Sequence, residues 1–372
     1  MRICVMTTGH NAFDSRIFYK EIMSLKKVYN DIYLIAPYDK KVDIVKGVHI
    51  IGIPKAKSLI QRYFLVDKVI KEAAKINADI YHFHDFEIIL KVLKLKKLVP
   101  NCKIIYDVHE YYPEMITMSR KIPEFIKPIG ASYVNRKEIN VASKLDYIIS
   151  TDDYNKERFS KVNNNVDIIY NFTDFKTDDG EKVEKEYDVI YQGGISIERG
   201  ALKLIEAINI IRSKKPDISM IFVGSFDDED VKEAVYKYIK ENNLSRNIKY
   251  IGRVSHEEVE NYIKKSRMGV VAFLPYPRYA KNIPIKQFEY MGCGVPVIGG
   301  YLPSVKRFIT AYNSGIIVDP NDARSIADAI LKLLDDPKLC KTLGENGIRA
   351  VRESYNWGNM EHKLLDIYAS LC

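Results

Sequence analysis

Short apolar runs alternate with amphipathic segments along most of the chain. The runs are rich in Ile, Val and Tyr and are bounded by Gly, Asp or Asn, which favours buried strands. Between them, apolar residues recur at the spacing of one helix face. In the first part of the chain this predicts strands at 3–7, 31–36, 48–53, 80–83, 103–107, 147–150 and 166–169, and helices at 15–27, 59–76, 87–98, 125–142 and 154–161.

The alternation is interrupted once and then starts again. Residues 173–185, TDFKTDDGEKVEK, are charged and turn-rich and have no apolar period, so we place a linker there. A last helical pattern at 357–371 has no strand after it, so we expect it to pack back across the domains. Between these points, strands are predicted at 188–191, 220–223, 248–251, 269–272, 295–298 and 315–318, and helices at 201–211, 230–242, 257–265, 284–291, 323–334 and 337–353.

This pattern predicts an α/β protein in which helices cover both faces of parallel sheets. At 372 residues the chain is longer than one core usually supports. We therefore expect two Rossmann-like domains, 1–172 and 186–354, whose sheets face each other across a cleft. The linker 173–185 joins them, and a crossover helix in 355–372 closes the chain.

Composition narrows the class of protein. With 47% hydrophobic residues the chain can fill two cores, and no apolar run is long enough to span a membrane. The first residues enter a strand pattern directly, so we expect a cytoplasmic protein without a signal peptide. The five cysteines are scattered and are expected to be free thiols. The net charge of +8 favours anionic partners.

Candidate binding residues lie in the loops that follow the predicted strands. In parallel sheets ligands bind outside the carboxyl ends of the strands. Two facing domains would bring these loops together around one cleft. The loops contain Gly9 and His10, His84 and Asp85, His109 and Glu110, Asn171, 193–199, Gly224 and Ser225, and Gly252 and Arg253.

The segment 276–300, YPRYAKNIPIKQFEYMGCGVPVIGG, combines a helix with charged groups. Pro284 suits the first position of a helix over 284–291. Lys286 and Glu289 are three residues apart and would be neighbours opposite the buried stripe of that helix. A helix N-terminus attracts phosphate, and a carboxylate can accept hydrogen bonds from two sugar hydroxyls. The same pattern also fits an ordinary Lys–Glu pair on a helix surface.

The sequence does not predict a metal site. Asp152 and Asp153 lie at a helix start, where they are better suited to capping than to metal binding, and the acidic run 227–230 is also expected to begin a helix. His82 and His84 share one face of a predicted strand, but no third ligand follows at a suitable spacing. We therefore expect no bound metal.

A series of motifs follows along the whole chain: FDSRIF, ADIYHFHDFE, IIYDVHEYYPE, YNFTD, YQGGISIERGALKLIEAI, FVGS, YIGRVSHEEV and IPIKQFEYMGCGVPVIG. Their order and spacing together resemble the GT-B glycosyltransferases of retaining family 4, in the branch that builds bacterial or archaeal surface polysaccharides. The resemblance implies transfer of a sugar from a nucleotide-sugar to an acceptor held by the N-terminal domain. It implies no metal and no cofactor, because the nucleotide-sugar is a substrate. A UDP-sugar is the expected donor, with a GDP-sugar as the alternative.

The resemblance also assigns catalytic roles. Glu289 matches the second glutamate of the family's E-x7-E motif, which accepts the ribose hydroxyls in relatives. Arg199 stands where the family usually has a lysine, and its fork suits a diphosphate. The arginine that relatives often place after the preceding glycine is absent, and Lys286 is a candidate to supply its charge. His109 occupies the position of the family histidine near the donor sugar.

One position departs from the family pattern. The first glutamate of E-x7-E would fall at position 281, where this chain has Lys281, so the donor sugar must be held differently. Pro284 has no N–H, so neighbouring amides would have to cradle the phosphate. The residues expected to bind the donor are Gly9, Gly194, Gly224, Ser225, Arg253, Val254, Asn282, Ile283 and Ile285.

The N-terminal domain is expected to hold a saccharide or lipid-linked acceptor. Basic and apolar residues interleave over 54–75, and more lysines and arginines lie within 94–97 and 120–137. This fits either peripheral contact with the inner face of an anionic membrane or a solvated surface. No motif for nucleic-acid binding is present. The acceptor-side candidates are His10, Arg16, His84, Asp85, Glu110 and Tyr111.

Two other functions remain open, and the oligomeric state is left undefined. An epimerase or phosphorylase could share the two-domain fold. A non-catalytic subunit that binds a nucleotide-sugar is the other alternative, and Lys281 would mark its degenerate site. A dehydrogenase is disfavoured because the loops TTGHNAFD and YQGGISIERG lack the G-x-G-x-x-G pattern.

Overall fold

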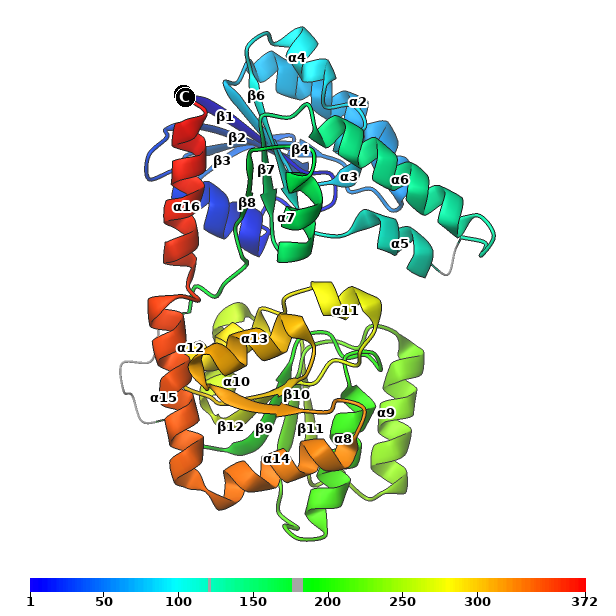
Figure 1. The fold of residues 1–372 in the computed structure, drawn as a ribbon, viewed down its shortest axis with the longest axis vertical. Coiled ribbons are helices and arrows are strands. Elements are labelled where there is room, and N and C mark those ends of the chain that lie inside the picture. Colours follow the sequence, from blue (N-terminus) through cyan, green and yellow to red (C-terminus); the bar gives the residue numbers. More distant parts are fainter. Residues whose placement is uncertain (120–121, 176–182) are drawn as a thin grey trace. The chain divides into compact units, whose positions relative to one another are not determined.

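The computed structural model describes residues 1–119, 122–175 and 183–372. The chain divides into two compact units, of which unit 1 contains residues 1–171 and 360–372 and unit 2 contains residues 172–359 (Figure 1). Part of the predicted linker, 176–182, lies outside the described residues, as do Arg120 and Lys121 of the predicted basic surface.

Unit 1 is built on an eight-stranded sheet with the strand order β3-β4-β2-β1-β5-β6-β7-β8. Every described pair of neighbours is parallel except β3 and β4. The strands are β1 (Arg2–Met6), β2 (Asp31–Pro37), β3 (Val42–Val45), β4 (Val48–Ile53), β5 (Ile80–Phe83), β6 (Lys103–Val108), β7 (Tyr147–Ser150) and β8 (Val166–Ile168).

The antiparallel strand β3 is a feature that the sequence pattern does not predict. Its apolar side chains face solvent, since Val42 is 64% and Ile44 is 61% exposed. The turn into β4 is formed by Lys46 and Gly47, with φ of 49° and 75°. Positive φ at both positions is typical of a two-residue hairpin turn.

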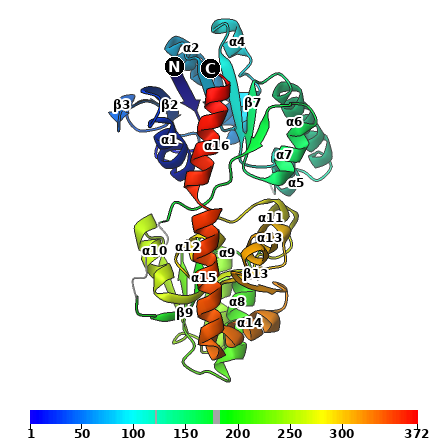
Figure 2. The same cartoon turned by 60° about the vertical axis from the view of Figure 1, so that its left-hand side comes forward.

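The helices of unit 1 differ from the predictions in three places. The predicted helix 15–27 begins as a π-helix, the predicted helix 87–98 is two short helices, and the loop after Tyr111 contains a helix of its own. Figure 2 shows the last helix, α16, running beside the sheet of unit 1. The helices are η1 (Ser15–Ile22), α1 (Met23–Leu25), α2 (Leu59–Ile76), α3 (Phe86–Ile89), α4 (Lys94–Leu98), α5 (Tyr112–Met118), α6 (Lys127–Ala142) and α7 (Asp153–Ser160). The helix α16 (Trp357–Ser370) begins in unit 2 and continues in unit 1 from Met360.

Unit 2 has a six-stranded sheet that is parallel throughout, with the order β11-β10-β9-β12-β13-β14. Its strands are β9 (Tyr187–Gln192), β10 (Met220–Val223), β11 (Ile248–Gly252), β12 (Ser266–Val271), β13 (Val297–Gly300) and β14 (Gly315–Val318). Its helices are α8 (Ala201–Arg212), α9 (Glu229–Glu241), α10 (His256–Lys264), α11 (Pro277–Lys281), α12 (Lys286–Gly292), α13 (Pro303–Tyr312), α14 (Ala323–Asp335) and α15 (Pro337–Glu353). The prediction of two parallel α/β domains is confirmed.

Each sheet has one point at which the strand order reverses. In unit 1 this point lies between β1 and β5, and in unit 2 between β9 and β12. Loops leave in opposite directions there, which opens a crevice at the carboxyl ends of the two strands. These two points are where a ligand is expected in each unit.

The predicted helix 284–291 needs a correction. It begins at Lys286, because the first helical carbonyl is that of Ile285, which accepts from the N–H of Phe288 at 2.9 Å. Every residue of α12 is buried, including Lys286 and Glu289, which are 6% and 5% exposed. The two charged residues are therefore not a surface pair.

The predicted helix caps are confirmed. Asp152 accepts the N–H of Asn155 at the start of α7, and Asp228 accepts the N–H of Val231 at the start of α9. Within the described parts of the chain, we find no helix that is both long and apolar enough to cross a membrane.

Candidate functional site

The reversal point of unit 2 holds a buried lysine. Lys286 lies at the carboxyl ends of both strands that border this point. Its Nζ is 3.9 Å from the ring centre of Tyr191, near the end of β9, and 5.2 Å from that of Phe273, just after β12. The position of α12 therefore brings a cation to the crevice of this sheet.

The amine of Lys286 has no hydrogen bond in the described structure. Its Nζ is buried and meets no acceptor among the residues described. Burial lowers the pKa of Lys286 to about 7, with the charge of Arg199 acting in the same direction and that of Glu289 in the opposite one. A buried cation without a hydrogen-bonding partner is costly, so an anion bound beside it would stabilise it.

Two glycine turns leave room in front of this lysine. Gly193 has a φ of 99°, and a Cβ there would lie 3.3 Å from Lys286 Nζ. Gly224 has a φ of 148°, and a Cβ there would lie 2.0 Å from the carbonyl oxygen of Gly193. The N–H of Gly224 donates to the carbonyl of Gly252 at 2.8 Å. The turns after β9, β10 and β11 thus touch through backbone, and glycine is required where they meet.

Arg199 fills the space beside Gly194. A Cβ at position 194 would lie 2.1 Å from Arg199 Nη1 and 2.7 Å from a carboxylate oxygen of Asp227. The Nε of Arg199 lies 3.4 Å from the hydroxyl of Tyr279. An arginine at position 194 would therefore collide with Arg199. Among the described residues, Arg199 and Lys286 are cations at this turn. Sequence reasoning did not place Asp227 beside them, because it assigned residues 227–230 to a helix start.

Glu289 is held at the end of β9. Its Oε2 accepts a hydrogen bond from the side-chain amide of Gln192. The hydroxyl of Tyr290 in turn accepts the backbone N–H of Gln192 at 3.0 Å. The carboxylate is one helical turn from Lys286, so a cation and an acceptor of hydrogen bonds lie close together in one crevice.

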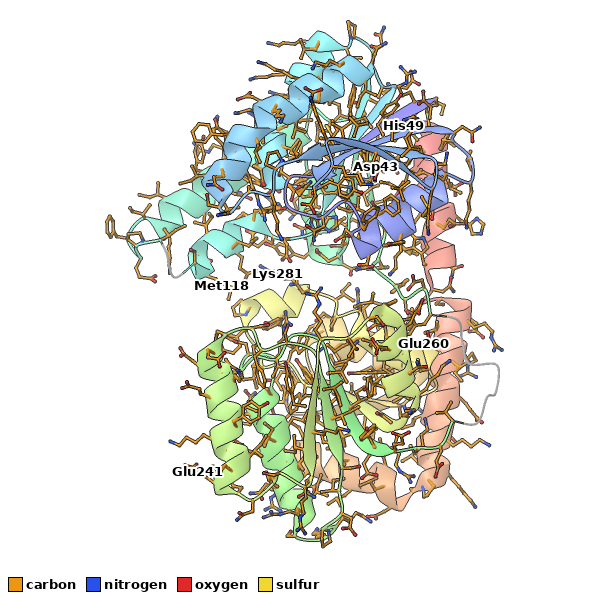
Figure 3. All side chains as sticks on the ribbon, turned by 180° about the vertical axis from the view of Figure 1, so that it is seen from behind. Asp43, His49, Met118, Glu241, Glu260 and Lys281 are labelled. Atoms are coloured by element: carbon orange, nitrogen blue, oxygen red, sulfur yellow. The ribbon has the colours of Figure 1, made fainter. Side chains whose placement is uncertain are left out.

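The other residues expected to bind the donor are less closely joined to this cluster. Ser225 lies in the turn after β10, where its carbonyl accepts the N–H of Ile195 at 2.9 Å. Arg253 is exposed, and the following residue is half-buried. Lys281, labelled in Figure 3, ends α11. The half-buried residues Val254, Asn282, Ile283 and Ile285 have no described side-chain hydrogen bond to Arg199, Lys286 or Glu289.

Asp85 organises the reversal point of unit 1. Its carboxylate accepts the hydroxyl of Thr7 and the N–H of Thr8, both at 2.7 Å, and the N–H of Gly9 at 3.2 Å. Asp85 is buried and fixes the loop after β1. The candidate Gly9 is thus held by Asp85, although the sequence assigned the two residues to different substrates.

Three histidines follow one another near the same strand ends. The Nδ1 of His84 lies 3.1 Å from the Nε2 of His109, and the rings of His109 and His10 are 5.3 Å apart. Burial lowers the pKa of His109 to about 4, although the Asp107 charge acts against this. His109 is therefore neutral at pH 7 and can donate one hydrogen bond and accept another.

Three acceptor-side candidates are buried, since Arg16 is 3%, His84 is 0% and Asp85 is 4% exposed. Asp85 fixes the loop after β1, and the other two lie deeper in unit 1. Arg16 donates to the carbonyl of Ile169 at 2.9 Å and to Asp107 at 3.0 Å, so it joins η1 to the sheet. The direct acceptor contact expected for these two residues needs correction, because each is enclosed by its own unit.

The last two acceptor-side candidates, Glu110 and Tyr111, directly precede α5. Glu110 is exposed, and Tyr111 is half-buried. The ring of Tyr111 lies 5.0 Å from that of Tyr154, and the guanidinium of Arg158 lies 5.2 Å from the ring centre of Tyr111. Together with His10, they remain the acceptor-side candidates with accessible surface.

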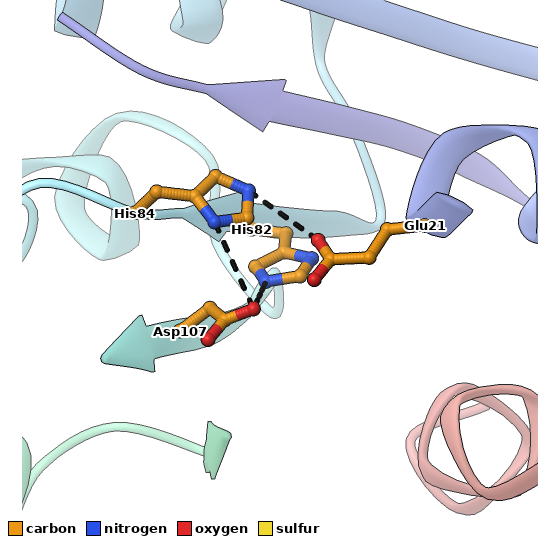
Figure 4. Close-up of side chains that lie close together, drawn as sticks. All are labelled: Glu21, His82, His84 and Asp107. Carbon is orange, nitrogen blue, oxygen red and sulfur yellow. Dashed lines mark ion pairs between the residues drawn. The ribbon is translucent and has the colours of Figure 1, made fainter. Parts of the chain in front are cut away.

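The sequence argument against a third ligand for His82 and His84 is wrong. Glu21 of η1 and Asp107 of β6 come next to them, and one potential ligand atom from each of the four residues lies within 4.8 Å of the others (Figure 4). Strand register could have revealed Asp107, because Phe83 pairs with Tyr106 and the next residues on each strand are His84 and Asp107. Glu21 had no such signal.

Two family models match the chain in succession, Glycosyltransferase Family 4 over residues 6–177 and Glycosyl transferases group 1 over residues 172–350. The chain is 28% identical over 176 residues to a capsular polysaccharide biosynthesis glycosyltransferase, CapM, of Staphylococcus aureus (46% of this chain, 44% of that protein). It is 25% identical over 176 residues to a GDP-mannose-dependent monoacylated alpha-(1-6)-phosphatidylinositol monomannoside mannosyltransferase of Corynebacterium glutamicum (46% and 44%). The chain spans about half the length of these curated relatives.

Solved structures share the fold along the whole chain. Sucrose-phosphate synthase from Thermosynechococcus elongatus superposes with a TM-score of 0.75 at 18% identity, covering 100% of this chain and 99% of that one. HepE from Anabaena in complex with UDP-glucose gives a TM-score of 0.75 at 15% identity, with 100% of both chains covered. The two successive family matches show that the chain belongs to the family 4 glycosyltransferases, and these superpositions show that it has the GT-B fold.

Proposed function

We propose that the protein transfers a sugar from a nucleoside diphosphate sugar to a saccharide or lipid-linked acceptor, in the synthesis of a cell-surface polysaccharide or glycolipid. The buried amine of Lys286 carries this proposal. It lies beside a glycine turn with Arg199 nearby, and its Nζ has no hydrogen bond to any described residue. A diphosphate bound by these two cations would supply the missing anion.

Glu289 would bind the ribose of the same donor. Its carboxylate is held by Gln192 at the crevice and can accept hydrogen bonds from two adjacent hydroxyls. The glycine turns would let backbone N–H groups approach the phosphates closely. Lys281 replaces the glutamate that contacts the donor sugar in relatives, so Asn282 is the candidate for that contact.

The proposed step is dominated by electrostatics. As the bond from sugar to phosphate breaks, negative charge builds on the departing nucleoside diphosphate, and Arg199 and Lys286 stabilise it from fixed positions. No covalent nucleophile is invoked, and the leaving phosphate takes the proton of the acceptor, so the sugar keeps its anomeric configuration. The two cations would carry the charge that a metal ion carries in other sugar transferases.

The names of the relatives support this class of reaction and suggest which donors to test. HepE was solved with UDP-glucose, and the mannosyltransferase of Corynebacterium glutamicum is named as GDP-mannose-dependent. UDP-sugars are therefore the first donors to test and GDP-sugars the second. CapM is named for capsular polysaccharide biosynthesis, which agrees with a surface glycan as product.

We further propose that unit 1 touches the cytoplasmic face of an anionic membrane. Apolar side chains are strongly exposed at the start of α2, where Ile60 is 71% and Phe64 is 68% exposed, and around the start of α6, where Phe125 is 79% and Ile129 is 72% exposed. Met118, labelled in Figure 3, ends α5 and is 41% exposed. The helices α2 and α6 also carry exposed basic residues, namely Lys68, Lys71, Arg136 and Lys137. Such a mixture suits an interface with acidic lipid.

The donor site is tested by calorimetric binding of UDP, GDP and ADP. We expect one of them to bind wild-type protein, and Arg199→Ala to weaken that binding by roughly 30-fold, because a hydrogen bond between charged groups contributes about 2 kcal/mol. Arg267→Ala is the matched control, since the Arg267 side chain is 50% exposed and lies at the amino end of β12, away from the crevice at the carboxyl ends. Equal affinity in both variants would remove Arg199 from the site.

The reaction is tested with the identified donor and a panel of saccharide and lipid-linked acceptors. We expect transfer only when an acceptor is present, and Arg199→Ala should lower turnover by orders of magnitude without changing the thermal midpoint. Epimerisation of the donor alone would indicate the epimerase. Binding without any turnover would support a non-catalytic subunit.

A further inference from the structure

We propose that Glu21, His82, His84 and Asp107 bind one divalent transition-metal ion in the interior of unit 1. The four side chains come from three elements, with Glu21 on η1, the two histidines on and just after β5, and Asp107 on β6. Figure 4 shows them turned toward one another. The proposal concerns unit 1 alone and does not depend on the proposed sugar transfer.

The Nε2 atoms of both histidines and Oε2 of Glu21 have no hydrogen bond to any described residue. The Asp107 oxygen nearest the histidines is Oδ2, which accepts a hydrogen bond from Arg16. All four side chains are buried, at 0% to 2% exposure. The Nε2 of His84 is 3.7 Å from Oε2 of Glu21, and the Nε2 of His82 is 3.9 Å from Oδ2 of Asp107. Ligands around a tetrahedral zinc ion lie about 3.4 Å apart, so small shifts would complete the site.

The Nδ1 atoms of the two histidines have partners outside the four-residue cluster. The Nδ1 of His82 lies 2.8 Å from the hydroxyl of Tyr368, and the Nδ1 of His84 lies 3.1 Å from the Nε2 of His109. Contacts of this kind orient metal-binding histidines and leave their Nε2 atoms for the ion. They also distinguish the cluster from a chance group of acidic residues.

Arg16 holds both carboxylates from one side. Its Nε is 2.7 Å from Oε1 of Glu21, and its Nη2 is 3.0 Å from Oδ2 of Asp107. Arg16 and Glu21 are five residues apart, a spacing that an α-helix would place on different faces. The π-helical geometry of η1, in which the N–H of Tyr19 reaches the carbonyl of Asp14 five residues back at 3.4 Å, brings them together.

Charge gives the cluster a reason to take up a cation. Two carboxylates and one guanidinium leave one negative charge in a fully buried place, where an uncompensated charge is costly. Either a metal ion or a proton held on Glu21 can compensate that charge. These are the two outcomes that the experiment below distinguishes.

The ligand set indicates both the kind of ion and its role. Two imidazoles with two carboxylates suit Zn²⁺ and neighbouring transition metals better than Mg²⁺ or Ca²⁺, which prefer oxygen ligands. Four protein ligands leave no open position, which is typical of a structural ion. The ion would link η1 to β5 and β6 near the carboxyl ends of these strands, where His84 contacts His109.

The test uses the full chain without a polyhistidine tag. Protein is stripped with a chelator, loaded with Zn²⁺ or Co²⁺ and passed through gel filtration, after which metal content and thermal unfolding are measured. We expect about one ion per chain, a rise of several degrees in the thermal midpoint on loading, and the strong visible absorption of four-coordinate Co²⁺. Wild-type protein that keeps less than about 0.1 ion per chain would overturn the proposal.

Variants show whether the ion is bound at this cluster. Glu21→Gln and His84→Gln should lose the ion and the rise in thermal midpoint, whereas the control His49→Gln, on β4 and labelled in Figure 3, should keep both. Metal retained by Glu21→Gln would place the ion elsewhere and contradict the proposal. If the metal-free wild type unfolds at the same temperature as Glu21→Gln, a proton and not a metal ion compensates the buried negative charge, and the proposal is wrong. Should His84→Gln not fold, the wild-type metal content and Co²⁺ spectrum decide.

Discussion

Replacing Lys286 by Met should stabilise unit 2, and by more at pH 6 than at pH 9. The amine of Lys286 is enclosed between the rings of Tyr191 and Phe273 and has no hydrogen bond to any described residue. Methionine has a similar length and no charge, so it can fill the same space without the cost of removing an ammonium group from water.

The magnitude follows from the pKa of Lys286, which burial lowers from 10.5 to about 7. At about 1.4 kcal/mol per unit of pKa, the buried charge costs about 5 kcal/mol near pH 6, where the amine is protonated in both folded and unfolded states. Between pH 7 and 10.5 the unfolded chain binds more protons than the folded one, so wild-type stability rises with pH. Near pH 9 the cost has fallen to about 2 kcal/mol. The cation–π contact with the Tyr191 ring, about 1 kcal/mol, exists only where the amine is charged, so the advantage of Met should fall from about 4 kcal/mol at pH 6 to about 2 kcal/mol at pH 9.

Urea unfolding followed by tryptophan fluorescence measures this difference directly. Trp357 is the single tryptophan of the chain, it is buried, and its backbone N–H donates to the carbonyl of Thr173 within unit 2. Its signal therefore reports on the unit that contains Lys286. Wild type and Lys286→Met are compared at pH 6 and pH 9 in the same buffers.

Lys332→Met is the matched control, because Lys332 is exposed near the end of α14. It should change the free energy of unfolding by less than about 0.5 kcal/mol at either pH. If Lys286→Met changes stability equally at pH 6 and pH 9, Lys286 does not titrate as a buried amine. The argument for an anion beside it would then lose its support.

Three further predictions concern the same crevice. Binding of a nucleoside diphosphate near pH 8 should be accompanied by proton uptake, because the bound anion raises the pKa of Lys286. Calorimetry in buffers of different ionisation enthalpy measures the number of protons taken up, and Lys286→Met should abolish the uptake. Glu289→Gln should weaken UDP or GDP binding about 10-fold but leave pyrophosphate binding unchanged, because only the nucleotide offers ribose hydroxyls. Gly224→Ala should lower the free energy of unfolding by about 2 kcal/mol or more, because its Cβ would meet the carbonyl of Gly193; a variant as stable as wild type would contradict this packing.

The fold was predictable to the extent that the chain buries continuous apolar runs. The bounds of β5 and β10 agree with the prediction because every residue of both strands is buried and all of them except His82 are apolar. The strand β3 was missed for the opposite reason, since Val42 and Ile44 point to solvent at a sheet edge.

For the crevice of unit 2, the sequence identified the charged residues Arg199, Lys286 and Glu289 but did not show that α12 is buried on all sides. Helical periodicity assigns one buried face, whereas α12 is packed on more than one side. A Cβ on Gly269 of β12 would lie 2.4 Å from the ring of Tyr290, and one on Gly347 of α15 would lie 3.0 Å from Met291 Cα. Nothing in the spacing of apolar residues shows that Lys286 is enclosed as well.

The histidine cluster of unit 1 shows a second limit of sequence reasoning. Ligands were sought at short spacing along the chain, but Glu21 reaches the histidines only because η1 is wound as a π-helix. That winding depends on tertiary contacts, among them the ion pairs of Arg16 with Glu21 and Asp107. Periodicity distinguishes helix from strand and does not reveal a local change of helical type.

The assignment of residues 360–372 to unit 1 has a consequence for synthesis on the ribosome. Leu364 and Tyr368 of α16 are fully buried, and Tyr368 contacts His82 from the opposite end of the chain. Residues 1–171 of unit 1 emerge first, but the unit cannot complete its interior until residues 360–372 have been synthesised. A nascent chain halted before α16 should therefore expose an unfinished apolar surface, a form that chaperones would be expected to hold.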